Sequence, residues 1–208
     1  MTHLESFIFQ NAYSYEAYRQ LIDQRFSDHK TTGIDHSESM LNYTSLNIAR
    51  MNRLDKKNRL TEETKSFLKS IQRPLTWLVL TEGWCGDAAQ IVPVLHYMAK
   101  ENQQITLKFV LRDENLPLMD AFLTDGGRSI PKVIILDTES LEIFADWGPR
   151  PTIPQELVLE GKKKAQLIED ESHQQEIKEE TSKQLHLWYA KNKTIAIQNE
   201  FLAVLSKI

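Results

Sequence analysis

The sequence has a single cysteine, Cys85, among 208 residues. One cysteine cannot form a disulfide within the chain, and it cannot build a metal site from several cysteines. Glycine and proline are also scarce, at seven each, which excludes a collagen-like or linker-like chain. Neither sign of charge dominates: 25 basic and 29 acidic residues leave a net charge of −4, whereas a nucleic-acid binder needs a basic face.

Long hydrophobic runs are missing as well. No run approaches the roughly 18 residues that predict a membrane span, and the stretch Leu75–Leu80 is only strand-sized. The N-terminus has no basic segment before its short apolar run, Phe7–Phe9, which argues against a signal peptide. We therefore expect a cytoplasmic protein with no membrane partner, and the sequence leaves its oligomeric state open.

The pattern of residue types divides the chain into three zones. Residues 1–73 carry apolar residues at spacings of three and four, which predicts helices. Residues 154–208 are also helical and rich in Lys, Glu and Gln, which is typical of a solvated helix face. Between them, a core of about 74–150 contains strand-like runs. No repeat or linker separates the zones, so we expect one domain, 1–208, with helical extensions at both ends.

The core predicts an α/β fold with a mixed central sheet. A helix predicted over 87–101 separates the first two apolar runs, and this order implies a parallel pair of strands joined by a crossover helix. A polar turn at 137–140 separates the last two runs, which suits an antiparallel hairpin. The four predicted strands span residues 75–80, 105–111, 132–136 and 141–144.

Cys85 is the candidate reactive group. It lies where the strand at 75–80 turns into the helix at 87–101, and the free backbone N–H groups at a helix start favour negative charge. This position predicts a lowered pKa for the thiol and a reactive thiolate. An inert, buried cysteine is the alternative that position alone leaves open.

The segment around Cys85 resembles the thioredoxin family. The residues Trp84-Cys85-Gly86 match the start of the family motif Trp-Cys-Gly-Pro-Cys, and Pro93 lies eight residues after the cysteine, as the helix-kinking proline of the family does. The resemblance implies a thioredoxin-like mixed sheet flanked by helices. It also implies that Trp84 shields the active cysteine.

Further matches imply a substrate groove opposite the cysteine. Ile130-Pro131 precedes the strand at 132–136 and matches the cis-proline of the family, beside which a peptide substrate pairs as a short strand. Gly148 matches the glycine that closes the rim of the site. Arg150 lies between two prolines and is a candidate to stabilise a thiolate or to hold a carboxylate, such as that of glutathione. The alternative for Arg150 is a surface arginine in a turn.

The departures from the family pattern bear on chemistry. Ala88 replaces the second cysteine and Asp87 replaces the intervening proline. Cys85 could attack a disulfide, but an external thiol must then release the product. Asp87 either raises the pKa of the thiol by charge repulsion or holds the first turn of the helix, and we favour the second role. The nearby Glu82 is expected to face solvent.

Three hypotheses for function remain. Cys85 is a working monothiol in thiol–disulfide exchange, or the chain is a non-catalytic binding module that uses the cis-proline groove, or Ala88 marks an engineered loss of a resolving cysteine. The retained motif favours the first, and the long terminal extensions, which could cover the groove, favour the second. We expect protein or glutathione thiols and disulfides as partners, no nucleic acid, no cofactor beyond an external thiol, and no metal, because the six histidines lack ligand spacing.

Overall fold

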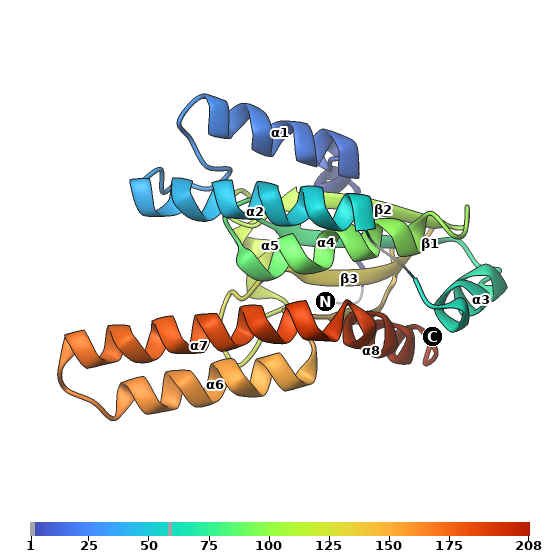
Figure 1. Cartoon of the computed structure of the whole chain (residues 1–208). Helices are drawn as coiled ribbons and strands as arrows, with labels where there is room; N and C mark the ends of the chain where they lie inside the picture. The colour runs from blue at the N-terminus through green and yellow to red at the C-terminus, as the bar shows by residue number, and fades with distance from the viewer. Residues whose placement is uncertain (1–2, 58–59) are drawn as a thin grey trace.

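A computed structural model of the chain describes residues 3–57 and 60–208 (Figure 1). At its centre lies a four-stranded sheet in the order β2-β1-β3-β4. In the view of Figure 1, helices α1 and α2 lie above the strands, and α6, α7 and α8 lie below them. The strands are β1 (Leu75–Thr81), β2 (Ile105–Leu111), β3 (Lys132–Asp137) and β4 (Ile143–Trp147).

The sheet has the mixed topology that the sequence predicts. β1 pairs in parallel with β2 and antiparallel with β3, and β3 pairs antiparallel with β4. All seven residues of β1 are buried, as expected for a central strand that is covered on both faces. The predicted start of the last strand was two residues early, because Leu141 has a positive φ of 59° and belongs to the turn. The Asp137 carboxylate accepts backbone N–H bonds within this turn.

Helices form both terminal extensions, which confirms that part of the predicted fold. A short helix, α5, follows β2 and was not predicted. The helices are η1 (Ser6–Asn11), α1 (Tyr15–Ser27), α2 (Glu38–Lys57), α3 (Glu62–Ser70), α4 (Gly86–Ala99), α5 (Leu116–Asp120), α6 (Thr152–Gln166), α7 (Glu171–Asn192) and α8 (Ile195–Leu205). None of the helices within 3–57 and 60–208 combines the length and apolar character that a membrane crossing requires.

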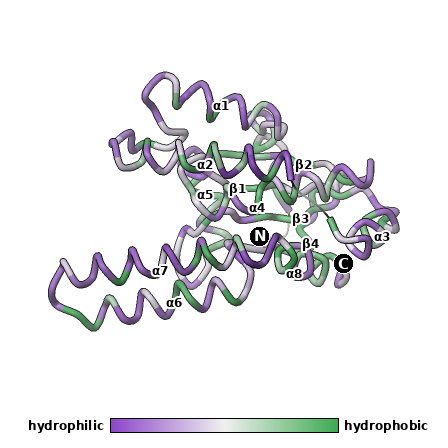
Figure 2. The backbone as a smooth tube through the Cα atoms, viewed as in Figure 1, coloured by the Kyte–Doolittle hydropathy of each residue, from purple (hydrophilic) through white to green (hydrophobic). Residues whose placement is uncertain are grey.

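Both extensions pack against the sheet through aromatic side chains. Tyr18 of α1 stacks on Phe109 of β2, with ring centroids 5.2 Å apart. Phe201 of α8 meets Trp77 of β1 edge to face at 4.7 Å. Hydrophobic residues gather along the strands, α4 and α8 (Figure 2), so the apolar core spans the sheet and both ends of the chain.

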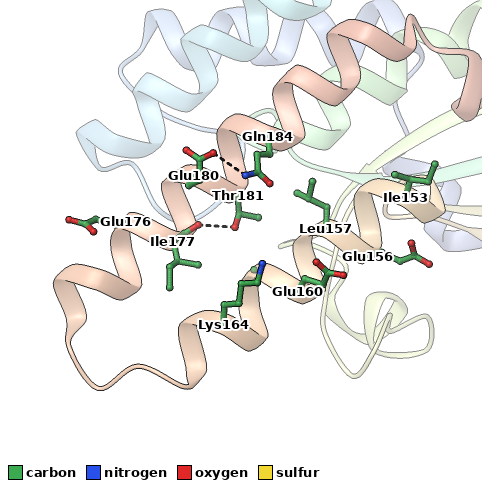
Figure 3. Close-up of a pocket in the computed structure, with 11 residues that line it drawn as sticks. Ile153, Glu156, Leu157, Glu160, Lys164, Glu176, Ile177, Glu180, Thr181 and Gln184 are labelled. Atoms are coloured by element: carbon green, nitrogen blue, oxygen red, sulfur yellow. Dashed lines mark hydrogen bonds between the residues drawn. The ribbon is translucent and has the colours of Figure 1, made fainter.

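Helices α6 and α7 form a hairpin that reaches beyond the sheet (Figure 1). They approach closely at Gly161, where an added Cβ would lie 2.3 Å from the Thr181 hydroxyl oxygen. The Thr181 hydroxyl instead donates to the Ile177 carbonyl oxygen at 2.7 Å (Figure 3). A cavity of about 510 Å³ lies between the two helices. Its charged lining residues are Glu156, Glu160, Lys164, Glu176 and Glu180.

Candidate active site

Cys85 is the N-cap residue of α4. Its backbone is extended, and its sulfur accepts a hydrogen bond from the Ala88 backbone N–H at 3.5 Å. The thiol donates to the Ile130 carbonyl oxygen at 3.2 Å. The structure therefore brings together the cysteine and the residue before Pro131, 45 positions later in the chain, as the sequence motif predicts.

The Cys85 thiol is buried, with 8% of the residue exposed. Burial raises the pKa of Cys85 to about 12, and the Asp87 carboxylate acts in the same direction. The backbone N–H groups of Ala88 and Asp87 and the Arg150 guanidinium lower this pKa, but they do not offset burial. The predicted reduction of the pKa was therefore wrong, because removal of the thiol from water outweighs the helix N-terminus.

Asp87 forms a buried ion pair beside the thiol. Arg150 donates to one Asp87 carboxylate oxygen through Nε at 3.0 Å and Nη2 at 2.6 Å. The Tyr189 hydroxyl donates to the other oxygen at 2.7 Å. The surface-arginine alternative was therefore wrong: Arg150 holds a carboxylate, and it is that of Asp87. Asp87 raises the pKa of Cys85, which is one of the two roles considered for it, and it links the start of α4 to Arg150 and Tyr189.

The Ile130–Pro131 and Gly148–Pro149 peptide bonds are both cis. Gly148 has a φ of +119°, and a Cβ added to it would lie 2.3 Å from the Pro131 carbonyl oxygen, so only glycine fits there. Ile130 is 4% exposed and Pro131 is buried. The backbone edge opposite Cys85 is therefore covered in this structure.

The other motif residues contact different parts of the chain. The Arg112 guanidinium lies 4.7 Å from the centre of the Trp84 ring. A Cβ added to Gly86 would lie 3.4 Å from the Arg50 Nη1 atom, so α2 covers the start of α4. Ala88 is buried at the position of the family's second cysteine.

Side chains from α2 and α7 complete the cover over the site, and no motif in the sequence predicts them. Asn47 is fully buried and donates to the Gly83 carbonyl oxygen at 3.1 Å. Arg50 donates to Asn47 at 2.8 Å, and its Nη2 atom lies 3.0 Å from His186 Nε2. No sequence pattern links Arg50 to His186, which are 136 positions apart. Polar residues on the buried face of α2 are a sequence signal that this helix covers a polar site.

Glu82 is fully buried, so the prediction that it faces solvent was wrong. The Thr32 hydroxyl donates to its carboxylate, and the Asp113 backbone N–H donates to Oε1 at 3.0 Å. Burial raises the pKa of Glu82 to about 7. The segment between α1 and α2 covers this carboxylate, and sequence patterns do not place such a loop.

A family profile described as thioredoxin matches residues 33–169, well over half of the chain. The chain belongs to the thioredoxin family. The matched residues include the thioredoxin-like motif at Cys85, the Ile130–Pro131 bond and Gly148, together with α2. Within the described ranges, no group of three or more His, Cys, Asp or Glu side chains is arranged to hold a metal ion.

One solved structure shares the overall fold of this chain. A crystal structure of a protein of unknown function from Pseudomonas aeruginosa is 18% identical, covers 96% of this chain and 95% of its own, and has a TM-score of 0.57. An HIV epitope scaffold is also 18% identical, covers 94% of this chain and 99% of its own, and has a TM-score of 0.49. No curated protein matches the sequence. At this level of identity the likeness concerns the fold alone.

Proposed function

We propose that this thioredoxin-family protein is a binding protein in which Cys85 does not act as a catalytic thiol. The burial of the sulfur, with its proton donated to the Ile130 carbonyl oxygen, is the observation that carries the proposal. A protonated thiol is a poor nucleophile, since the thiolate is the attacking species. Ala88 also leaves no resolving thiol within the chain.

The backbone edge at Ile130 and Pro131 is covered, and this affects which surface a partner can bind. Because Ile130 and Pro131 are buried, the proposal favours a binding surface other than the cis-proline groove. A cytoplasmic location stays a prediction from the sequence.

Monothiol exchange is the second candidate function, and the hydrogen bond from the Ala88 N–H to the Cys85 sulfur favours it. In this reaction the Cys85 thiolate attacks one sulfur of a disulfide, and the other sulfur leaves as a thiolate. An external thiol such as glutathione then attacks the mixed disulfide, which reduces Cys85 and carries the substrate sulfur away as a new disulfide. Protein or glutathione disulfides are the partners that this candidate requires.

Alkylation by iodoacetamide distinguishes the two candidates, because Cys85 is the single thiol. The rate is measured between pH 6 and 10 by intact mass on folded protein and on the same protein unfolded in guanidinium. With a pKa of about 12, folded protein should react at least about 100-fold more slowly than unfolded protein at pH 8, and its rate should still rise at pH 10. A folded rate equal to the unfolded rate, with an apparent pKa below about 8.5, would contradict the proposal.

Three variants make this measurement specific. Cys85→Ser supplies the blank. Asp87→Asn removes the charge that raises the pKa of Cys85 and should accelerate alkylation, whereas Glu160→Gln changes the net charge equally on the distant hairpin and should have no effect. Circular dichroism verifies that each variant is folded. A mixed disulfide formed by the folded wild-type protein with oxidised glutathione at pH 7 would favour monothiol exchange instead.

A further inference from the structure

A cavity of about 700 Å³ lies where α2 and α4 meet α7 and α8. Among the lining residues that the structure describes, all the charged ones are basic: Arg53, Lys56 and Lys57 on α2, and Lys193 in the turn after α7. Within residues 3–57 and 60–208, none of these four side chains forms an ion pair with a carboxylate. Positive charge therefore gathers in one cavity of a chain whose net charge is −4.

The rest of the cavity lining is mainly apolar. Leu54, Leu60 and Ile197 are buried beside it, while Ile195 is 39% exposed and Ala190 is also exposed. The volume falls within the roughly 300–1,000 Å³ of sites that bind small organic molecules. The cavity thus offers apolar surface and unpaired cations to the same ligand.

The cavity between α6 and α7 has the opposite charge. Four glutamates and a single lysine, Lys164, line it (Figure 3). A further cavity beside α6 and α7, of about 530 Å³, has two basic lining residues, Lys162 and Lys178. The cavity at α2, α4, α7 and α8 differs from both because four basic residues line it.

We propose that this basic cavity binds a small amphipathic anion, a molecule with one carboxylate or phosphate head group on an apolar chain. Charge-assisted hydrogen bonds from Arg53 and the lysines hold the head group. The apolar chain covers Ile195 and removes apolar surface from water. A cationic amphiphile of the same length would meet four like charges.

The cavity also adjoins the side chains that surround Cys85. Tyr189 lines it and donates its hydroxyl hydrogen to Asp87, and Gln90 lines it one helical turn after Asp87. Arg53 donates to Gln90 at 3.3 Å. The inference deepens the proposed binding function and rests on it. The two fail separately, because alkylation of Cys85 without ligand tests the thiol, and ligand titration tests the cavity.

The test is isothermal titration of the full chain with decanoate and decyl phosphate, each below its micelle concentration. At least one of them should bind with a stoichiometry of one. Acetate and inorganic phosphate provide the head groups alone, and decyltrimethylammonium provides the opposite charge. These three should bind at least about tenfold more weakly, since each lacks either the apolar contact or the ion pair.

Two variants of the cavity are compared with a matched control. Lys56→Gln/Lys57→Gln should weaken binding at least about tenfold, and Ala190→Phe should abolish it by filling the cavity without a change of charge. Lys163→Gln/Lys164→Gln also neutralises two adjacent lysines in the last turn of a helix and should leave binding unchanged. The proposal is overturned if neither anion binds, if a head group alone or the cation binds equally well, or if the two lysine pairs have the same effect.

Discussion

The Cys85 sulfur lies between a backbone donor, the Ala88 N–H, and a backbone acceptor, the Ile130 carbonyl. A helix N-terminus stabilises a nearby negative charge by about 0.3–1 kcal/mol at an exposed site. Raising the pKa of Cys85 from 9.0 to about 12 corresponds to about 4 kcal/mol against the thiolate. The free-energy cost of the buried thiolate is larger than the stabilisation by the helix N-terminus. Cys85 therefore keeps its proton in the folded protein although it lies at the start of a helix.

Glu82 supplies a prediction about pH. The pKa of this buried carboxyl is raised from 4.5 to about 7, so the folded state holds a proton that the unfolded state releases. The contribution of Glu82 to stability is therefore present below pH 4.5 and is lost as the pH rises to about 7. Glu82→Gln, which stays neutral, should gain about 2–3 kcal/mol in unfolding free energy relative to the wild type between pH 5 and pH 8.

Urea unfolding of both proteins at pH 5 and pH 8 measures this difference, and titration of the histidines cancels in the comparison. Glu63→Gln, on the exposed side of α3, serves as the control and should show no such change. An equal stability difference at the two pH values would show that Glu82 titrates as an ordinary surface acid.

Local sequence patterns predict those helices and strands whose formation depends on residues close together in the chain. β1 and α4 follow from a continuous apolar run and from the turn that leads into a helix. The five-residue α5 is too short to show a period, and the start of β4 depends on the turn at Leu141. Within the site, the resemblance to the thioredoxin family predicts the contact between Cys85 and Ile130, which lie just before α4 and just before β3.

The close approach of α6 and α7 gives a prediction for Gly161. Alanine is a better helix former than glycine by about 1 kcal/mol, but its Cβ would lie 2.3 Å from the Thr181 hydroxyl oxygen. Gly161→Ala should therefore lower the thermal midpoint, and Thr181→Ala in the same chain should restore it. A double-mutant cycle followed by circular dichroism measures the coupling. If Gly161→Ala alone raised the midpoint, the close packing would be refuted.

For the whole molecule, we predict that residues 1–208 unfold as one domain. Phe201 is fully buried against Trp77 and Trp147, with ring centroids 4.7 Å and 5.5 Å apart. Phe201→Ala should cost about 3–5 kcal/mol and lower the urea midpoints of tryptophan fluorescence and far-ultraviolet circular dichroism together. Leu187→Ala, at a side chain that is 58% exposed, should cost less than about 0.5 kcal/mol. Two separate transitions would show that the extensions are independent units.

The existence of the extensions could be predicted from the sequence, but their positions could not. The Thr61 backbone N–H donates to the Gln198 side-chain oxygen at 2.9 Å, and Arg50 contacts His186. The N-terminal and C-terminal extensions therefore contact each other directly. Such contacts depend on the packing of whole helices, and no periodic pattern in either segment specifies its partner. The sequence therefore does not predict that Tyr189 lies beside Asp87.

The contact between Tyr189 and Asp87 joins residues that are synthesised at different times. Tyr189 is added to the chain about 100 residues after Cys85, and at about 5–20 residues per second a ribosome needs about 5–20 seconds to make them. During this interval the motif around Cys85 has no α7 to cover it. The surroundings of Cys85 are therefore complete only after α7 has been synthesised and Tyr189 has reached Asp87.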